Sequence, residues 1–213
     1  MFSLLFPPKC LFCRRLLTGE ETDLCHPCRA DAPEFINRKR SIPFVAHWTA
    51  VWYYKGNVGK SIRRFKFYNA RGYDRVYARF LAGKLLADEK FDFDILTWVP
   101  VSPLRRLCRG YDQSQLLAVA VARELAVQPV KVLIKHRHTK PQSKLKGIAQ
   151  RRANILNAYR VPHPEQIRGK RILLLDDVIT TGATSSECAK TLLIAGAKEV
   201  QFAAIAAASY DKK

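Results

Sequence analysis

Apolar runs alternate with helical stripes along the chain, and this pattern predicts an α/β fold. Continuous apolar runs predict buried strands at 49–55, 94–100, 130–135, 171–176 and 200–207, with a further short strand near 158–161. Apolar residues at helical spacing predict helices at 56–68, 71–85, 114–126 and 184–195. Because such strands alternating with helices are typical of parallel sheets covered on both faces, we expect a parallel sheet flanked by helices.

Four cysteines near the N-terminus have the spacing of a metal site. Cys10 and Cys13, and then Cys25 and Cys28, form two C-x2-C pairs separated by eleven residues. This spacing favours one tetrahedral Zn²⁺, although a pair of disulfides is the competing interpretation. Four thiolates close the coordination shell, so the zinc is expected to be structural, with His26 as a bystander.

The cysteine module predicts a two-part chain. We expect a zinc finger over residues 1–40 and a larger α/β domain over residues 41–213, because residues 31–43 mix proline and charge without periodicity and resemble a linker. Cys108 and Cys188 have no partner at useful spacing, and we expect them to be small packed thiols.

The charge of the chain is strongly positive. It has 37 Lys and Arg against 18 Asp and Glu, for a formal net charge of +19. This favours a polyanionic partner, which is a nucleic acid, a phosphorylated substrate or an anionic membrane, and the alternative is a solvated basic surface. The apolar run Met1–Pro8 is too short to span a membrane, so we expect a soluble cytoplasmic protein.

Two adjacent acids interrupt this basic chain at the predicted carboxyl end of a strand. Asp176 and Asp177 follow the apolar run, and the loop 180–184, rich in threonine, leads into a helix. The loop N–H groups and the helix N-terminus can bind a phosphate, while the acids can bind sugar hydroxyls with Mg²⁺ nearby. Ordinary helix capping is the alternative, but it explains only one of these residues.

The stretch "ILLLDDVITTGAT" (172–184) resembles the phosphoribosyl pyrophosphate (PRPP) motif of type I phosphoribosyltransferases. The resemblance implies the type I phosphoribosyltransferase fold. It implies that Asp176 and Asp177 hold the ribose hydroxyls of PRPP. It also implies a 5′-phosphate site made by Thr180, Thr181, Gly182, Ala183 and Thr184.

Two further stretches resemble the ComF-type proteins of bacterial competence. They are "WVPVSPLRRLCRGYDQS" (98–114) and "RHTKPQSKLKGIAQRRANILNAY" (137–159), and the cysteine module completes the resemblance. It implies a pyrophosphate loop over Pro100–Arg109 and a hood over residues 136–152. The loop residues expected to bind pyrophosphate are Pro100, Val101, Arg105 and Arg109. The family usually has asparagine at the position of Asp112, which leaves the role of this acid open.

Basic residues are concentrated in two segments. Residues 55–79 contain eight Lys and Arg against one acid, and residues 125–164 contain nine and no acid. Cationic surfaces with interleaved aromatic residues bind single-stranded nucleic acid. The predicted DNA contacts are Lys60, Arg63, Arg64, Lys66, Lys140, Lys144, Arg151 and Arg152.

These observations lead to two hypotheses of different classes. The first is a PRPP-binding competence protein that handles incoming single-stranded DNA, with a competence helicase and other transformation proteins as expected partners. The second is an active phosphoribosyltransferase with a small amine or base as acceptor. Thr180 stands where purine-salvage relatives have an acid, which argues against hypoxanthine or guanine as the acceptor.

Overall fold

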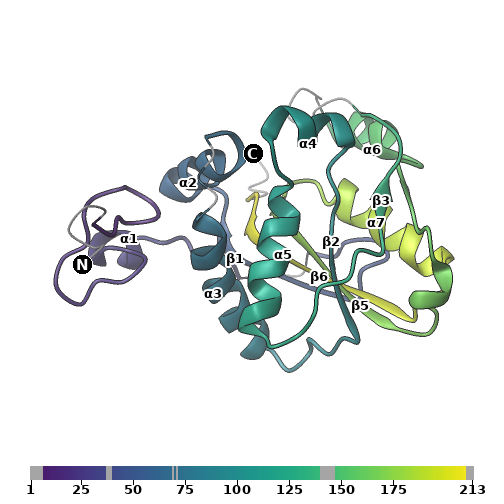
Figure 1. The fold of residues 1–213 in the computed structure, drawn as a ribbon, viewed down its shortest axis with the longest axis horizontal. Helices are drawn as coiled ribbons and strands as arrows, with labels where there is room; N and C mark the ends of the chain where they lie inside the picture. Colours follow the sequence, from purple (N-terminus) through teal and green to yellow (C-terminus); the bar gives the residue numbers. More distant parts are fainter. Residues whose placement is uncertain (1–6, 37–39, 69, 71, 140–146, 210–213) are drawn as a thin grey trace.

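A four-stranded parallel sheet forms the centre of the molecule (Figure 1). The computed structural model describes residues 7–36, 40–68, 70, 72–139 and 147–209. Within the sheet the strand order is β1-β6-β5-β2. The strands are β1 (His47–Tyr53), β2 (Ile95–Trp98), β5 (Arg171–Ile179) and β6 (Glu199–Ala207). This confirms the predicted α/β architecture.

The prediction of a full strand at 130–135 is wrong. Only β3 (Ile134–Lys135) is a strand, and it pairs antiparallel with β4 (Tyr159–Arg160) in a separate two-stranded sheet. The run touches the main sheet at its beginning, where Val130 N donates to Leu96 O at 2.9 Å. It then leaves the edge of β2, because its later residues pair with β4 instead.

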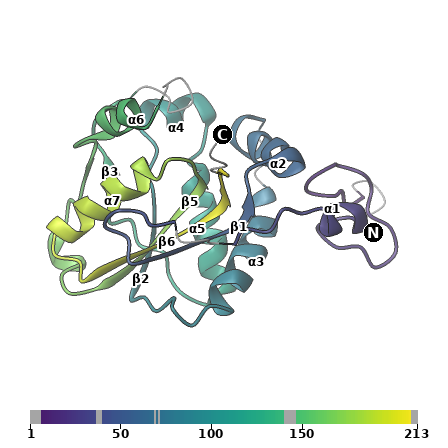
Figure 2. The ribbon, with the colours of Figure 1, turned by 180° about the vertical axis from the view of Figure 1, so that it is seen from behind.

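Helices cover both faces of the sheet, with α3 and α5 on one face and α7 on the other (Figures 1 and 2). The helices are α1 (His26–Ala30), α2 (Gly56–Phe67), α3 (Tyr73–Leu86), α4 (Pro103–Arg109), α5 (Gln113–Glu124), α6 (Ile148–Ile155), α7 (Ala183–Ile194) and a 3-10 turn (Pro164–Gln166). Two of them correct the predictions. α4 lies in the segment 100–109, which was expected to be the pyrophosphate loop. α6 begins in the segment 136–152, which was expected to be the hood, and no helix was predicted in either segment.

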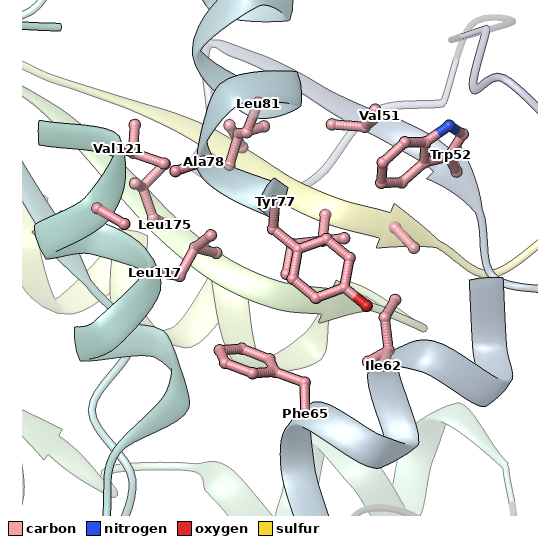
Figure 3. Close-up of a cluster of buried hydrophobic side chains, with 14 of the residues drawn as sticks. Val51, Trp52, Ile62, Phe65, Tyr77, Ala78, Leu81, Leu117, Val121 and Leu175 are labelled. Atoms are coloured by element: carbon pink, nitrogen blue, oxygen red, sulfur yellow. The ribbon is translucent and has the colours of Figure 1, made fainter. Parts of the chain in front are cut away.

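The core on the α3 side is built around Tyr77, as Figure 3 shows. The Tyr77 ring is fully buried and packs edge-on against Phe65 of α2 at 5.6 Å between ring centroids. Its hydroxyl donates to Ser61 Oγ at 2.8 Å, so the polar end of the ring is satisfied. Burying a large side chain of this kind contributes about 1.5 to 3 kcal/mol, and it fastens α2 to α3.

The N-terminal module packs directly on this core. Phe12 is buried and its ring meets Trp52 of β1 edge-on at 5.1 Å between centroids. The segment 31–43 is not the loose linker that we expected. Phe35 and Ile42 in this segment are buried, and Phe35 N donates to Val51 O at 3.0 Å. These contacts fasten the segment to β1.

Across the part of the chain that the structure describes, no helix combines the length and apolar character that crossing a membrane requires.

Candidate functional site

The acidic pair lies where β5 extends past its neighbour β2. The pairing of β2 with β5 ends at Trp98 and Leu175, whereas the pairing of β5 with β6 continues to Ile179. Asp176 and Asp177 are therefore the first residues of β5 without β2 beside them. The strand was expected to end at Asp176, so it is longer than expected. The two acids still lie at the carboxyl end of the sheet, where parallel α/β sheets bind ligands.

Asp176 is half-buried and anchored by two hydrogen bonds to one oxygen. Its Oδ1 accepts from Ser114 Oγ at 2.9 Å and from the Asp177 backbone N–H at 2.8 Å. Ser114 lies in the first turn of α5, and no sequence pattern singles it out. Burial and the neighbouring Asp177 carboxylate raise the pKa of Asp176 to about 7.

Asp177 is more deeply buried, with 3% of its surface exposed. Its Oδ1 lies 3.0 Å from Lys66 Nζ on α2. Its Oδ2 is buried and has no hydrogen-bond partner among the described residues. An orphaned acceptor of this kind is costly unless a ligand or ion satisfies it.

The predicted phosphate loop surrounds a hollow. The hollow is lined by Asp176, residues 178–185 and Phe202. Asp177 does not line it, so the structure separates the two acids, which were expected to act together. Gly182 caps α7 with φ of 78°, a left-handed conformation that suits glycine. The first turn of the twelve-residue helix α7 lines the hollow, and a helix N-terminus of this kind favours an anion such as a phosphate.

A residue outside the motif holds this loop. The Arg40 guanidinium donates to Thr180 O, and to Ala208 O at 3.5 Å. The Arg40 carbonyl in turn accepts from Trp48 Nε1 at 2.7 Å. Arg40 has no periodic or motif context in the sequence, so sequence reasoning missed it.

The predicted pyrophosphate loop contains α4, whose arginines also contact the protein. Arg105 donates to Thr139 O at 2.9 Å, and Arg109 donates to Gln113 Oε1 at 2.9 Å. The Arg109 guanidinium also lies 4.9 Å from the centroid of the Phe67 ring. Pro100 is buried and Val101 is half-buried. These residues are positioned at the end of β2, and their contact with pyrophosphate stays a prediction.

The position of Asp112 explains why an acidic residue can stand there. It is the N-cap of α5, and it accepts from Ser114 N at 3.0 Å and Gln115 N at 3.1 Å. Its second oxygen accepts from Val101 N at 3.1 Å. Burial raises the pKa of Asp112, while these N–H groups favour its charged form. Asp112 therefore fastens the segment after β2 to α5.

The candidate DNA contacts on α2 divide into two kinds. Lys60 and Arg63 are exposed. Arg64 instead donates to Leu11 O at 2.9 Å, and Lys66 pairs with Asp177. The fold therefore already binds Arg64 and Lys66, whereas Lys60 and Arg63 face solvent, and DNA contact by the four residues stays a prediction.

The hood is described only in part. Lys140 and Lys144 lie outside the described residues, whereas Arg151 is half-buried and Arg152 is exposed on α6.

Near the C-terminal end of α2, Phe67 and Tyr68 expose 61% and 75% of their surfaces, so both rings can accept a stacking partner. DNA binding by these groups stays a prediction.

The four N-terminal cysteines form a cluster. The sulfur atoms of Cys10, Cys13, Cys25 and Cys28 all lie within 4.8 Å of one another, and all four thiols are free of disulfides. A tetrahedral Zn²⁺ with Zn–S bonds of about 2.3 Å needs sulfur separations of about 3.8 Å, and the sulfurs of Cys13 and Cys25 lie 3.6 Å apart. Burial raises the pKa of Cys25, but hydrogen bonds from Cys28 N and neighbouring side chains outweigh it and bring the pKa to about 6. The cluster is consistent with a structural zinc.

The remaining cysteine and histidine predictions have mixed outcomes. The His26 side chain is exposed and bonds Glu21, so it stays outside the cluster as expected. Cys188 is buried as expected, but the prediction for Cys108 is wrong, because Cys108 is exposed on α4.

Comparison with known proteins agrees with this arrangement. The profile of the phosphoribosyl transferase domain family matches residues 112–213, and the double zinc ribbon domain matches residues 1–40. "Competence protein F" of Haemophilus influenzae is 29% identical over 91% of this chain and 94% of its own length. The chain belongs to the ComF family of competence proteins.

Other ComF relatives cover more or less of the chain. "Competence protein ComFC" of Streptococcus pneumoniae is 28% identical over 89% of this chain and 77% of its own length. "DNA utilization protein YhgH" of Escherichia coli O157:H7 is 37% identical over 51% of this chain and 47% of its own length. This ComF chain thus combines a phosphoribosyltransferase-like fold with an N-terminal four-cysteine ribbon.

Proposed function

We propose that this protein binds PRPP together with Mg²⁺ and handles single-stranded DNA during natural transformation. The observation that carries the PRPP part is the hollow that joins Asp176 to the loop 180–182 and the N-terminus of α7. Such a hollow offers hydroxyl acceptors at one end and phosphate donors at the other. PRPP carries both kinds of group, ribose hydroxyls and a 5′-phosphate, on one sugar.

The described residues fit a Mg²⁺ that arrives with its ligand. Near the hollow the protein offers the carboxylates of Asp176 and Asp177. Asp177 Oδ2 has no hydrogen-bond partner among the described residues, so it can accept one more contact. Mg²⁺ prefers oxygen ligands and is commonly held by one or two carboxylates together with substrate phosphates. The ion would neutralise the pyrophosphate, while Asp176 orients the sugar.

Calorimetric titration with PRPP in Mg²⁺ tests this part. We expect the Asp176→Ala, Asp177→Ala double variant to lose at least about tenfold in affinity, because each lost hydrogen-bonding group costs about 1 to 3 kcal/mol. Circular dichroism should confirm that the variant keeps its fold. Unchanged affinity in a folded variant would exclude the ribose role of these acids.

The DNA part rests on charge and exposed rings. The net charge of +19 exceeds what one PRPP molecule needs, and Lys60 and Arg63 lie on the same helix as the exposed Phe67. Cations that track the backbone and rings that stack on bases are the two parts of a single-strand site. The names of the relatives, which mention competence and DNA utilization, support this assignment.

Fluorescence anisotropy at several salt concentrations tests the DNA surface. The Lys60→Ala, Arg63→Ala variant should weaken binding of single-stranded DNA for all sequences and flatten the slope of log affinity against log salt by about 1.4, since each phosphate contact contributes about 0.7. A Lys170→Ala, Lys198→Ala control removes two exposed charges outside both basic segments and should change neither quantity. If the two double variants have the same slope of log affinity against log salt, the exposed face of α2 is solvated and does not contact DNA.

Turnover is the second outcome to measure. Release of pyrophosphate from PRPP with a small amine or base present, and without DNA, would favour the active phosphoribosyltransferase. Strict dependence of PRPP binding or turnover on DNA would favour the competence role.

A further inference from the structure

Helix α2 connects the cysteine ribbon to the acidic pair through two basic residues. Arg64 and Lys66 are two positions apart, so they leave the helix on opposite sides. Arg64 reaches the ribbon, and Lys66 reaches Asp177. One rigid element therefore contacts both places.

The ribbon end of this connection is a pair of backbone contacts. The Arg64 guanidinium donates to Leu11 O at 2.9 Å and to Phe12 O at 2.6 Å. Both carbonyls belong to the turn between Cys10 and Cys13, whose shape a bound metal would fix. Arg64 Nε also donates to Tyr73 Oη at 3.3 Å, which ties the same side chain to α3.

The site end is a buried ion pair. Lys66 Nζ lies 3.0 Å from Asp177 Oδ1, and the two side chains expose 23% and 4% of their surfaces. A partner removed from such a pair leaves an uncompensated buried charge, so the pair constrains both side chains. The pair occupies Oδ1 and leaves the orphaned Oδ2 for another contact.

We propose that Lys66 is a positioning residue of the PRPP site, which holds the Asp177 side chain and, with it, the Asp177 backbone N–H that donates to Asp176 Oδ1 beside the hollow. The inference rests on the proposed PRPP binding. It adds that α2 makes this orientation depend on the ribbon, through Arg64. The ribbon does not line the hollow, yet the turn between Cys10 and Cys13, which Arg64 contacts, then contributes to PRPP affinity.

PRPP titrations on three lysine variants test the role of Lys66. Lys66→Met should lower the affinity by about tenfold or more, because the orientation of a buried carboxylate is lost. Lys66→Arg keeps the charge and should recover most of the affinity. Lys60→Met removes an exposed lysine of the same helix and should bind PRPP like the wild type.

Two arginine variants test the connection to the ribbon. Arg64→Met keeps the apolar stem and removes both carbonyl contacts, and it should weaken PRPP binding by roughly threefold to tenfold while zinc stays bound, as expected for a typical coupling between sites. The control is Arg29→Met, which removes a contact inside the ribbon, from Arg29 to Thr22 O. It should leave PRPP affinity unchanged. Because Arg64 does not contact Asp177, this variant carries the test even if Lys66→Met fails to fold.

The outcomes separate the two proposals. Wild-type PRPP affinity in a folded Lys66→Met variant overturns the positioning role, and wild-type PRPP affinity in Arg64→Met overturns the dependence on the ribbon. Both results leave PRPP binding itself intact. Failure of Lys66→Arg to recover affinity lost in Lys66→Met assigns the loss to packing and also overturns the positioning role. Absence of PRPP binding by the wild-type protein overturns both proposals.

Discussion

Asp176→Asn should stabilise the ligand-free protein, and increasingly so as the pH rises. Both hydrogen bonds to Asp176 end on Oδ1, from Ser114 Oγ and from Asp177 N. The amide oxygen of asparagine can accept the same two bonds, so the substitution removes the charge and keeps the contacts. The substitution removes the free-energy cost of burying the charged Asp176 beside the Asp177 carboxylate.

The size of the effect follows from the pKa of Asp176, which is about 7 in the folded protein against 3.8 for an ordinary aspartate. Between these values the folded protein binds a proton that the unfolded chain has lost, so wild-type stability falls as the pH rises through this window. From pH 5 to pH 8 the fall amounts to about 2 to 3 kcal/mol. Asparagine does not titrate, so the Tm advantage of the variant should grow by roughly 5 to 10 °C.

Differential scanning calorimetry at pH 5, 6, 7 and 8 measures this difference, without PRPP. Asp94→Asn is the matched control, because hydrogen bonds from Arg171 lower the pKa of Asp94 to about 2. Both its folded and unfolded pKa values lie below pH 5, so Asp94→Asn should be less stable than wild type by the same amount at every pH. A Tm difference for Asp176→Asn that stays flat from pH 5 to pH 8 would refute the reasoning.

Two further substitutions test the loop and the ribbon. Gly182→Ala should cost about 1 kcal/mol of stability in chemical denaturation, because its φ of 78° strains an L-residue while its Cβ would meet Ile42 at an ordinary 3.6 Å. The same variant should bind PRPP more weakly in calorimetry, and equal stability would remove the conformational argument. Cys25→Ser should reduce zinc in metal analysis below the roughly one equivalent expected of a four-thiolate site, with a lower Tm. Full zinc occupancy in that variant would argue against the four-cysteine site.

The sequence pattern predicted the elements that are marked by their own residues. α3 was predicted from its stripe of apolar residues, and it runs from Tyr73 to Leu86. The four strands of the main sheet were predicted from apolar runs because both of their faces are buried. The four-cysteine cluster was predicted because its ligand spacing is encoded in two short motifs.

Elements decided by long-range contacts were missed. α4 begins at Pro103 and has no buried residue, so no apolar stripe marks it. The acidic pair was found from its motif, but the different positions of its two residues were not. Asp176 lines the hollow, whereas Asp177 pairs with Lys66 of α2, which is far away in the sequence. Arg40 was missed for the same reason, since its partners are carbonyl groups that no side-chain pattern reveals.

The clamp on the phosphate loop also limits how such a protein can be cut or recombined. Arg40 and Thr180 are 140 positions apart, and the predicted division between the two parts falls directly after Arg40. A fragment starting at residue 41 would keep the entire PRPP motif and Ile42 beneath Gly182, but it would release the carbonyl of Thr180. Exchange of the ribbon at this boundary would therefore alter the phosphate loop of the recipient wherever the incoming segment lacks an arginine at position 40. The two parts of the chain are expected to evolve as one unit, joined by a residue that belongs to the first and acts on the second.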